Sequence, residues 1–527
     1  MKHNNVRNIF ILNSLFQVNF KPMYQVSLNK PALFMQLFIV QKIDKILRIV
    51  TFIHIYQNLN KLCIQTMNFN SCKVGIWGYG VVGASALRYF KNQQCSQIGI
   101  IDTKPLSQDI IHHHKHLPLK LFQAIDLHQF LNEHDFILPS PGIDLRAYQA
   151  YSTKFLNEFD LFSVQWHKPI IAITGTIGKT TITHILSHLL QTAGHTIATG
   201  GNIGVAMLDL LAQQTISDYA LLELSSFQLE YCAQSAPSIA VITNIYPNHL
   251  DRHGSLEQYQ AAKYRISTNQ TYSQITLAPL HLARSLRHAH NLVHTTQRNY
   301  HFFSDHQPTS DEYALLIHND SLYYYHEGMI FHYCNGDTKY LCHMTHSSLT
   351  YPINWLILHA LLDILNLNQH IISQALATLE IPEHRLSCIA HHNGISFYND
   401  SKATIPEATL AALKKLQGKP LILFLGGTSK GVNRHAALLD FKNFTIKHII
   451  CFGKEAVPLK LACDMHVLPA TAYDTLEAAF ANCMHDIAQS GDHILFSPAG
   501  ASFDLFTHYQ ARGDRFKELV NRYINND

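Results

Sequence analysis

The segment IIAITGTIGKTTITHILSHLL, residues 170–190, runs from an apolar stretch through a glycine-rich loop into a stretch with helical periodicity. Its loop, TGTIGKTT at residues 174–181, looks like a phosphate-binding loop, but the usual pattern G-x-x-x-x-G-K-[ST] would need a glycine at Ile173. Glycines stand instead at Gly175 and Gly178. A strand that ends in such a loop and continues as a helix directs backbone N–H groups and the helix dipole at a bound anion. The segment therefore predicts an α/β domain with a phosphate site, and not a glycine-rich turn without a ligand.

Two side chains at the start of the expected helix extend this prediction. Lys179 is placed to bridge the terminal phosphates of a nucleotide, and the Thr180 hydroxyl is placed to hold Mg²⁺. The loop thus predicts nucleotide phosphates and Mg²⁺ as ligands.

The length and composition indicate a folded chain of several domains and exclude several classes of protein. With 527 residues, three or four domains are expected, and 47% hydrophobic with 15% charged residues supplies several cores. The formal net charge of +3 is too small to indicate a nucleic-acid-binding protein. The 10 cysteines have irregular spacing and no C-x-x-C pair, so a disulfide framework or a zinc ribbon is not expected and a reducing cytoplasm fits.

Residues 1–66 differ from the rest of the chain. They contain no glycine, and their apolar stretches are interrupted by Lys42, Asp44, Lys45 and Arg48. No uninterrupted apolar run approaches the roughly 20 residues of a membrane span. The segment is either an amphipathic extension that lies on a surface or translated upstream sequence before a true start at Met67. We favour the second reading and expect residues 1–66 to be non-native or disordered.

Strand and helix patterns alternate in three successive regions, which predicts an α/β fold with domains at residues 67–157, 158–381 and 382–527. The first region contains GYGVVG at residues 78–83, a G-x-G-x-x-G pattern between a strand and a helix, and a second strand that ends at Asp102. Residues 218–227 and 238–251 predict buried parallel strands, and residues 296–345 predict a β-rich segment. In all three regions polar residues gather where strands end, which is where open α/β sheets bind ligands.

Two charged residues stand in apolar surroundings. Glu223 ends an apolar strand, so it is either a ligand of Mg²⁺ or a cap of the next turn through Ser225 or Ser226. Lys263 lies seven residues after Leu256 on the apolar face of an expected helix. It is either a buried lysine with a lowered pKa that carbamylation could turn into a metal ligand, or a lysine that snorkels from the edge of the face.

Together these features resemble the Mur ligase family, from about Lys73 to the C-terminus, and most closely its D-glutamate-adding members. The motifs that carry the resemblance are TGTIGKTT, GGNIG, ELSSFQLE, NHLDRHGSLEQYQAAKYRI, HR at 384–385, NDSKAT, LGGTSKG and SPAGASFDLF. In this family the loop reads T-G-[TS]-x-G-K-[ST], so the missing glycine is normal.

The resemblance implies three domains: a Rossmann-like domain that binds UDP, a central P-loop ATPase-type domain, and a Rossmann-like C-terminal domain with the amino-acid site. It implies that ATP activates the carboxylate of UDP-N-acetylmuramoyl-L-alanine as an acyl phosphate, which the amine of D-glutamate then attacks. It further implies two Mg²⁺ ions, a carbamylated Lys263, a cytoplasmic monomer, and no nucleic-acid or membrane partner.

The resemblance also assigns residues, position by position. The catalytic residues would be Lys179, His249 and Lys263. ATP would contact Gly175, Thr176, Gly178, Lys179, Thr180, Thr181, Asn354, Arg385 and Asp400. Metal ligands would be Thr180, Glu223, His249 and Lys263. The UDP substrate would contact Val81, Val82, Asp102, Thr103, Lys104, Ser140, Gly142 and Asn202. D-glutamate would contact Lys402, Thr404, Lys430, Ser502 and the backbone at Tyr509.

Four single positions and one segment depart from the family pattern. Ile177 replaces an Asn of the loop, Asn248 an Asp, Ile405 an Asn and Val82 a hydroxyl residue, and the segment TYPIN keeps only the last Asn of H-N-x-x-N. These departures leave open a paralogue with impaired catalysis. The motifs also leave open a sister ligase for another amino acid, a folylpolyglutamate synthase or an NAD-dependent oxidoreductase. An oxidoreductase would leave Lys179, Glu223 and Lys263 unexplained.

Overall fold

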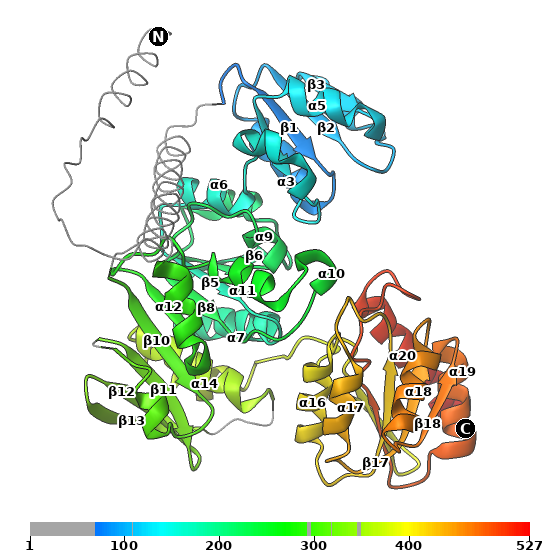
Figure 1. The fold of residues 1–527 in the computed structure, drawn as a ribbon. Helices are drawn as coiled ribbons and strands as arrows, with labels where there is room; N and C mark the ends of the chain where they lie inside the picture. Colours follow the sequence, from blue (N-terminus) through cyan, green and yellow to red (C-terminus); the bar gives the residue numbers. More distant parts are fainter. Residues whose placement is uncertain (1–68, 108, 292–296, 318, 345–348, 527) are drawn as a thin grey trace, which may run out of the picture. The chain divides into compact units, whose positions relative to one another are not determined.

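The structure is a computed structural model and describes residues 69–107, 109–291, 297–317, 319–344 and 349–526. The predictions made for residues 1–66 therefore lie outside the described residues. Across the described ranges, none of the helices combines the length and the apolar character needed to cross a membrane. The strands form three separate sheets of four, nine and six strands (Figure 1).

The first sheet is parallel and has the strand order β3-β2-β1-β4. Neighbouring residues of β1 enter different cores: Ile76 packs with Leu87, and Trp77 packs with Phe130. Two helices therefore cover opposite faces of this sheet, α3 (Val81–Phe90) on one and α5 (Leu127–Glu133) on the other. The strands are β1 (Lys73–Trp77), β2 (Gln97–Ile101), β3 (Leu119–Phe122) and β4 (Phe136–Pro139), and α4 spans Asp109–His113.

The second sheet has the order β13-β12-β11-β10-β9-β8-β5-β7-β6. It is parallel from β6 to β11, and a hairpin of β12 and β13 adds two antiparallel strands. The strands are β5 (Ile170–Thr174), β6 (Ile197–Gly201), β7 (Tyr219–Glu223), β8 (Ile239–Ile242), β9 (Ile275–Pro279), β10 (Asn299–Ser304), β11 (Ser321–His326), β12 (Met329–Cys334) and β13 (Asp337–His343).

Both faces of this second sheet are buried, as its apolar strands require. On β5, Ile171 and Ile173 belong to one core and Ile170 and Ala172 to another. The first core includes residues of α7 (Lys179–Thr192), α14 (Pro352–Ile364) and α15 (Ile371–Ala375). The second includes residues of α6 (Glu158–Gln165), α8 (Met207–Leu210), α9 (Ser226–Leu229), α11 (Leu256–Tyr264) and α12 (Ala283–Asn291).

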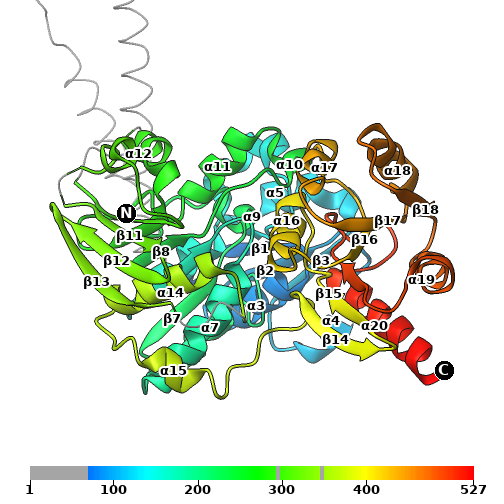
Figure 2. The ribbon, with the colours of Figure 1, turned by 90° about the horizontal axis from the view of Figure 1, so that it is seen from below.

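The third sheet has the order β14-β15-β19-β16-β17-β18, and its pairs are parallel except β14 with β15. Residues of α16 (Pro406–Lys415), α17 (His435–Phe441) and α18 (Ala456–Met465) share one core, and residues of α19 (Leu476–Asn482) and α20 (Tyr509–Asn526) share the other. Figure 2 shows α20, in red, beside β14 and β15. The strands are β14 (Ser387–His392), β15 (Ile395–Asn399), β16 (Leu421–Gly426), β17 (Ile446–Phe452), β18 (Ala470–Tyr473) and β19 (His493–Phe496).

The three-part α/β fold expected from the sequence is confirmed, and some local predictions need correction. Each sheet falls within one predicted domain range, while the boundaries themselves stay predictions. The strand expected over 218–227 ends at Glu223, because Ser225 caps a new helix, α9. The strand expected over 238–251 covers only Ile239–Ile242, and the short helix α10 (Leu250–His253) follows it. The β-rich segment expected over 296–345 is confirmed by strands β10 to β13, with the short helix α13 (Ser310–Tyr313) between β10 and β11.

Candidate active site

The loop after β5 has two glycines at positions where only glycine fits. Gly175 has φ +144°, and a Cβ there would lie 1.9 Å from Thr243 Oγ1. Gly178 has φ +87° and is the N-cap of α7, and its Cβ would lie 2.9 Å from Asn354 Oδ1. Ile173, where the usual pattern has its first glycine, is instead a fully buried residue of β5. The loop is therefore an intact turn with its own glycine pattern.

Asn244, which follows β8, holds the backbone of this loop. Its Oδ1 accepts from the amides of Thr176 at 3.2 Å and Ile177 at 3.0 Å, and its Nδ2 donates to Ile177 O at 3.0 Å. Thr243 Oγ1 also donates to Ile177 O, at 2.7 Å. Asn244 is absent from the residues proposed from the sequence. The available signal was its position as a polar residue at the end of a strand next to β5.

Two lysines of the predicted site converge on one carbonyl of the loop. Lys179 Nζ donates to Gly175 O at 2.9 Å and to Thr176 O at 3.1 Å. Lys263 Nζ donates to the same Gly175 O at 2.7 Å and contacts Thr174 Oγ1 at 3.4 Å. Burial lowers the pKa of both ammonium groups, and the charge of Lys179 lowers the pKa of Lys263 further.

Lys263 is buried, so the snorkelling interpretation is wrong. The residue is 1% exposed, on the inner face of α11, and its Nζ lies 4.7 Å from the centre of the Tyr259 ring. α11 ends at Tyr264, so Ile266, which the sequence placed on the same helical face, lies beyond its end. An amine with a strongly lowered pKa is available in its neutral form, which is the form that carbamylation requires.

Glu223 ends β7 beside the loop strand and is 1% exposed. Its Oε1 accepts from Asn202 Nδ2 at 2.8 Å, and its Oε2 is buried with no hydrogen-bond partner. The cap of α9 comes from Ser225, whose hydroxyl accepts from Gln228 N, so Glu223 does not serve as that cap. An unpartnered buried carboxylate oxygen fits the predicted cation site.

His249 is the N-cap of α10, and its backbone has a left-handed conformation with φ +53°. Burial, followed by the charges of Lys430, Lys263 and Lys179, lowers the pKa of His249 to about 2. The ring is therefore a neutral imidazole with a lone pair at physiological pH. It lies edge-on to Phe227 at 4.8 Å between ring centres.

The residues predicted to reach the nucleotide from beyond the loop are buried around it. Arg385 Nη1 donates to Thr181 Oγ1 in the first turn of α7 at 3.1 Å, and its Nη2 is buried without a partner. Asn354 Nδ2 donates to Thr350 Oγ1 at 2.7 Å. Burial raises the pKa of Asp400 to about 7, and its oxygens accept from Ser497 Oγ and Leu386 N. Thr180 is half-buried in the same turn of α7.

The lysines predicted to hold D-glutamate have lowered pKa values. Burial lowers the pKa of Lys402 to about 7, with Arg385 and Lys179 adding to the effect, and burial lowers the pKa of Lys430 to about 8. Lys402 Nζ lies 3.9 Å from the centre of the Tyr509 ring. Of the other predicted residues, Thr404 is half-buried, Ser502 is buried, and Tyr509 O accepts from Ser401 Oγ at 2.8 Å. The backbone of Tyr509 therefore already has a protein donor.

Arg512 is a second residue that the sequence reasoning missed. It is fully buried, and it donates to Ser401 O at 2.7 Å, to Ser401 Oγ at 3.1 Å and to Gly500 O at 2.9 Å. It thus joins the loop of Lys402 to the loop of Ser502. The sequence pattern that could have indicated Arg512 is its position four residues before the apolar Phe516, on the same face of α20. A cation on an apolar helical face is also the pattern that identified Lys263.

The predicted UDP-binding residues of the first region lie after the carboxyl ends of β1, β2 and β4, and Asn202 follows β6 of the second sheet. Asp102 accepts from Tyr79 N at 2.6 Å and from Lys104 N at 2.9 Å, and these bonds lower its pKa against the opposing effect of burial. Ser140 Oγ donates to Gly78 O at 3.1 Å. Both side chains therefore brace the glycine loop. At the start of α3, Val81 is exposed and Val82 half-buried, and Thr103 is exposed with Lys104 after β2.

A further metal-like group occurs in the third region, and the sequence did not predict it. Within the described ranges, Glu383, His384 and Asp514 are the group of three possible ligands found close together. Asn399 Nδ2 donates to Gly513 O at 2.9 Å and faces His384 Nδ1 at 3.2 Å, while Ser401 N donates to Asn399 Oδ1. His384 Nδ1 is therefore the acceptor, and Nε2 carries the proton toward Asp514 Oδ1 at 3.4 Å. This tautomer fits a histidine–carboxylate contact and not a metal ligand.

Comparison with known proteins gives the same fold. Residues 173–345 match the Mur ligase middle domain, and residues 384–500 match the Mur ligase, glutamate ligase domain. The crystal structure of MurF ligase from Thermotoga maritima in complex with ADP has a TM-score of 0.50 at 15% identity, covering 88% of this chain and 99% of that one. A pseudomurein peptide ligase type C from Methanothermus fervidus has a TM-score of 0.50 at 15% identity, covering 86% and 100%.

Curated relatives are more similar in sequence. The UDP-N-acetylmuramoylalanine–D-glutamate ligase of Desulfotalea psychrophila is 32% identical over 74% of this chain and 83% of its own length. The protein of the same name from Vibrio campbellii is 30% identical over 86% of this chain and 99% of its own length. Fold, phosphate loop and relatives define an ATP-dependent, amide-bond-forming ligase. The chain belongs to the Mur ligase family.

Proposed function

We propose that this enzyme joins D-glutamate to UDP-N-acetylmuramoyl-L-alanine with conversion of ATP to ADP and phosphate, in cytoplasmic synthesis of peptidoglycan precursors. The observation that carries the proposal is the grouping of four residues around the loop that follows β5. Lys179 and Lys263 both donate to Gly175 O, Glu223 ends the neighbouring strand β7, and His249 lies in the loop after β8, the other neighbour of β5. The names and coverage of the curated relatives support the choice of substrates.

In the first step, the alanyl carboxylate attacks the γ-phosphorus of ATP, an acyl phosphate forms, and ADP leaves. This step brings several anions together, so positioned positive charge supplies much of the stabilisation. Lys179 and the backbone amides of residues 178–181, at the start of α7, bind the phosphates. Arg385 adds a cation at the first turn of α7. Burial strengthens each of these electrostatic interactions.

In the second step, the amine of D-glutamate attacks the activated carbonyl, phosphate leaves, and the nitrogen loses a proton as the amide forms. The two carboxylates of D-glutamate need a cation and directed donors. Lys402, Thr404, Lys430, Ser502 and Tyr509 are our candidates for these contacts, with Arg512 as the group that holds their loops together. Val81, Val82, Asp102, Thr103, Lys104, Ser140, Gly142 and Asn202 are our candidates for the UDP substrate.

Magnesium fits the donor set of this site. Thr180 and Glu223 would hold one ion, and His249 with a carbamylated Lys263 would hold a second, with the orphaned Glu223 Oε2 as the supporting observation. When bound, the ions would supply charge neutralisation for the phosphates. Lys263 itself binds Gly175 O in its unmodified form. We further propose that the enzyme acts as a monomer.

The test measures phosphate release from ATP with purified enzyme, UDP-N-acetylmuramoyl-L-alanine and one amino acid at a time. Release with D-glutamate, and not with L-glutamate, L-lysine or diaminopimelate, is expected. Release with one of the other amino acids would assign a sister ligase. An enzyme that releases phosphate with none of them would be the catalytically impaired paralogue.

A further inference from the structure

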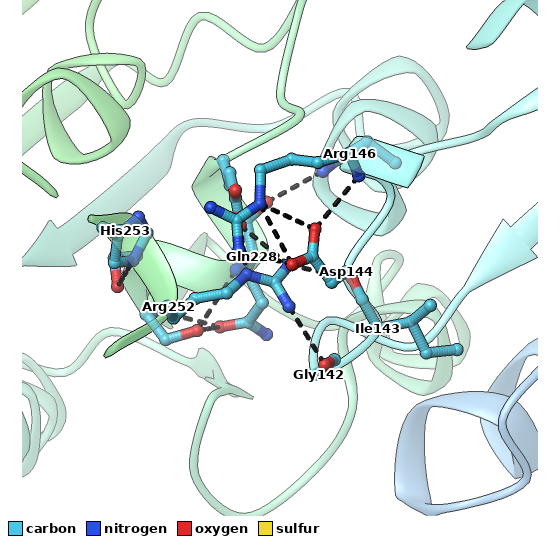
Figure 3. A network of polar contacts seen from close by, with 11 residues as sticks. Gly142, Ile143, Asp144, Arg146, Gln228, Arg252 and His253 are labelled. Atoms are coloured by element: carbon cyan, nitrogen blue, oxygen red, sulfur yellow. Dashed lines mark hydrogen bonds and ion pairs between the residues drawn. The ribbon is translucent and has the colours of Figure 1, made fainter. Parts of the chain in front are cut away.

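Arg252 connects the segment that carries His249 to the turn after β4. It lies on α10, three residues after His249, and its side chain is 12% exposed. Its Nη1 donates to Gly142 O at 3.2 Å, and its Nη2 donates to Ile143 O at 2.9 Å. Figure 3 shows this side chain extending to the turn that contains Gly142 and Ile143.

The guanidinium is fixed in this position by a carboxylate. Glu230, directly after α9, accepts at Oε2 from Arg252 Nε at 3.1 Å and from Nη2 at 2.9 Å, and its side chain is 15% exposed. Four donations from one planar, largely buried guanidinium leave little rotational freedom. The backbone carbonyls of the turn therefore have a fixed position relative to α9 and α10.

The same guanidinium lies beside the aromatic ring that supports His249. Its carbon is 5.6 Å from the centre of the Phe227 ring, and that ring meets His249 edge-on. Phe227 also stacks on His253, whose Nε2 contacts Ser226 Oγ at 3.0 Å. One continuous set of contacts thus runs from His249 through Phe227 to Arg252 and the turn at Gly142.

The turn at Gly142 is connected by hydrogen bonds to β1 and to the glycine loop that follows it. Ser140 N donates to Trp77 O at 2.7 Å, Ser140 Oγ donates to Gly78 O, and Ile143 N donates to Ser140 O at 3.0 Å. A force or displacement at Arg252 therefore reaches the glycine loop at residues 78–83 through backbone contacts. The UDP moiety of the substrate would lie at the turn at Gly142, and its reacting carboxylate would lie near His249, so Arg252 connects the two segments that hold one substrate.

We infer that Arg252 is a positioning residue, which sets the turn that holds the UDP moiety at the right distance from the site where the alanyl carboxylate reacts. This inference rests on the proposed function. A substrate that spans both segments can react only if both ends are in register, and a small misplacement is enough to lose the geometry of attack. Arg252 touches the turn and not the reacting atoms, so its effect is indirect.

The test compares wild type with Arg252→Ala and Arg252→Lys. A lysine supplies one charge but cannot bind the carboxylate and both carbonyls at once. For both variants kcat/KM for UDP-N-acetylmuramoyl-L-alanine should fall by about ten- to a hundredfold, through kcat as well as KM, while KM for ATP stays within about twofold. The Kd for UDP alone, measured by calorimetry, should not change, because UDP does not extend from the turn at Gly142 to the site where the alanyl carboxylate reacts.

Two controls separate positioning from damage. Arg88→Ala removes another bidentate arginine contact, from α3 to Asp209 on α8, at 2.8 and 2.6 Å, and should leave kcat/KM unchanged. The double variant Arg252→Ala/Glu230→Ala removes the stranded carboxylate and should stay impaired, because the carbonyls of the turn remain unheld.

The inference is overturned if Arg88→Ala has the same effect, if the double variant regains activity, if UDP affinity falls as far as kcat/KM, or if Arg252→Lys is fully active. Wild-type turnover is the separate readout of the proposed function, because the inference depends only on ratios between variant and wild type.

Discussion

Lys263 shows how a single buried cation marks the site at the residue scale. Its ammonium group is taken out of water and placed beside Lys179, and its acceptors are one carbonyl and one hydroxyl. Such an arrangement costs folding free energy, so a lysine kept in it is a candidate for a functional role. The sequence identified Lys263 by its position on an apolar helical face, and the structure then excluded snorkelling by showing the side chain buried.

Lys263→Ala should be almost inactive in phosphate release, because the variant lacks the amine that would become a carbamate. Short carboxylic acids such as acetate should restore part of the activity by supplying an oxygen ligand in the space of the missing side chain. The matched control is Lys168→Ala, whose lysine donates only to the carbonyls of Thr215 and Ser217. A fully active Lys263→Ala enzyme would refute the carbamate.

Substitutions at Ile177 and Asn244 test which side chain fixes the conformation of the phosphate loop. Asn244→Ala removes three hydrogen bonds to the loop and should raise KM for ATP about tenfold or more, since each such bond contributes about 1 kcal/mol. Ile177→Asn restores the side chain common in the family and should change KM for ATP by less than about threefold, because the backbone is already held.

Steady-state kinetics with varied ATP checks both variants. A large fall of KM for ATP in Ile177→Asn would mean that the native loop lacks a needed side-chain contact. An unchanged KM in Asn244→Ala would mean that the loop keeps its shape without this asparagine.

At the scale of elements, α6 and α8 are joined by a buried carboxyl. Glu158 Oε1 accepts from Met207 N, the first residue of α8, at 3.1 Å, and its Oε2 is buried without a partner. Burial raises the pKa of Glu158 from 4.5 to about 7. The folded protein therefore keeps this carboxyl protonated at pH values where the unfolded chain has ionised it.

Glu158→Gln should make the protein more stable above pH 7 and nearly unchanged at pH 4.5. Because the folded pKa is the higher one, stability is lost as pH rises from the unfolded to the folded value, and the neutral amide avoids a loss of roughly 3 kcal/mol. Thermal unfolding of wild type and variant between pH 4.5 and 8 measures the difference. Glu380→Gln, at an exposed position, is the control, and a gain that did not depend on pH would contradict the assignment.

The elements themselves were largely predictable, and the side-chain partners were not. Strands such as β5 and β16 are continuous apolar runs followed by glycine, so local pattern identifies them. α10 is four residues long and begins at a left-handed histidine, which periodicity cannot show. The sequence analysis also missed Arg252, because its contacts are with a turn 109 residues away in the chain.

At the scale of the whole molecule, loops of the third sheet meet the loop that follows β8. Lys430 O accepts from Asp251 N at 3.5 Å, and a Cβ on Gly431 would lie 3.0 Å from the same amide nitrogen. The site is thus composed of loops from separate sheets. The family motifs indicated that these loops belong together, but the sequence alone gave no contact such as that of Arg512 with Ser401 and Gly500.

Gly431→Ala tests this contact. Gly431 has φ +77° and Gly418 has φ +83°, so alanine at either position should cost roughly 1–2 kcal/mol of unfolding free energy. A Cβ at Gly418 meets no atom within 4 Å, so Gly418→Ala is the matched control and should keep wild-type kinetics.

Gly431→Ala should also lower kcat/KM for D-glutamate, because its new methyl group presses on Asp251. Denaturant unfolding and steady-state kinetics of the two variants measure both effects. Equal kinetics of the two alanine variants would show that the contact has no part in catalysis.

The hairpin of β12 and β13 offers an attachment point for probes. Its turn, Asn335 and Gly336, is exposed and has positive φ at both residues, and six strand steps separate β13 from the phosphate-loop strand β5. At about 4.8 Å per step, the turn lies about 30 Å from the chemistry along the sheet. A short dye-binding peptide inserted there would report from the rim of the second sheet, and single enzyme molecules could be followed through turnover without a label near any substrate.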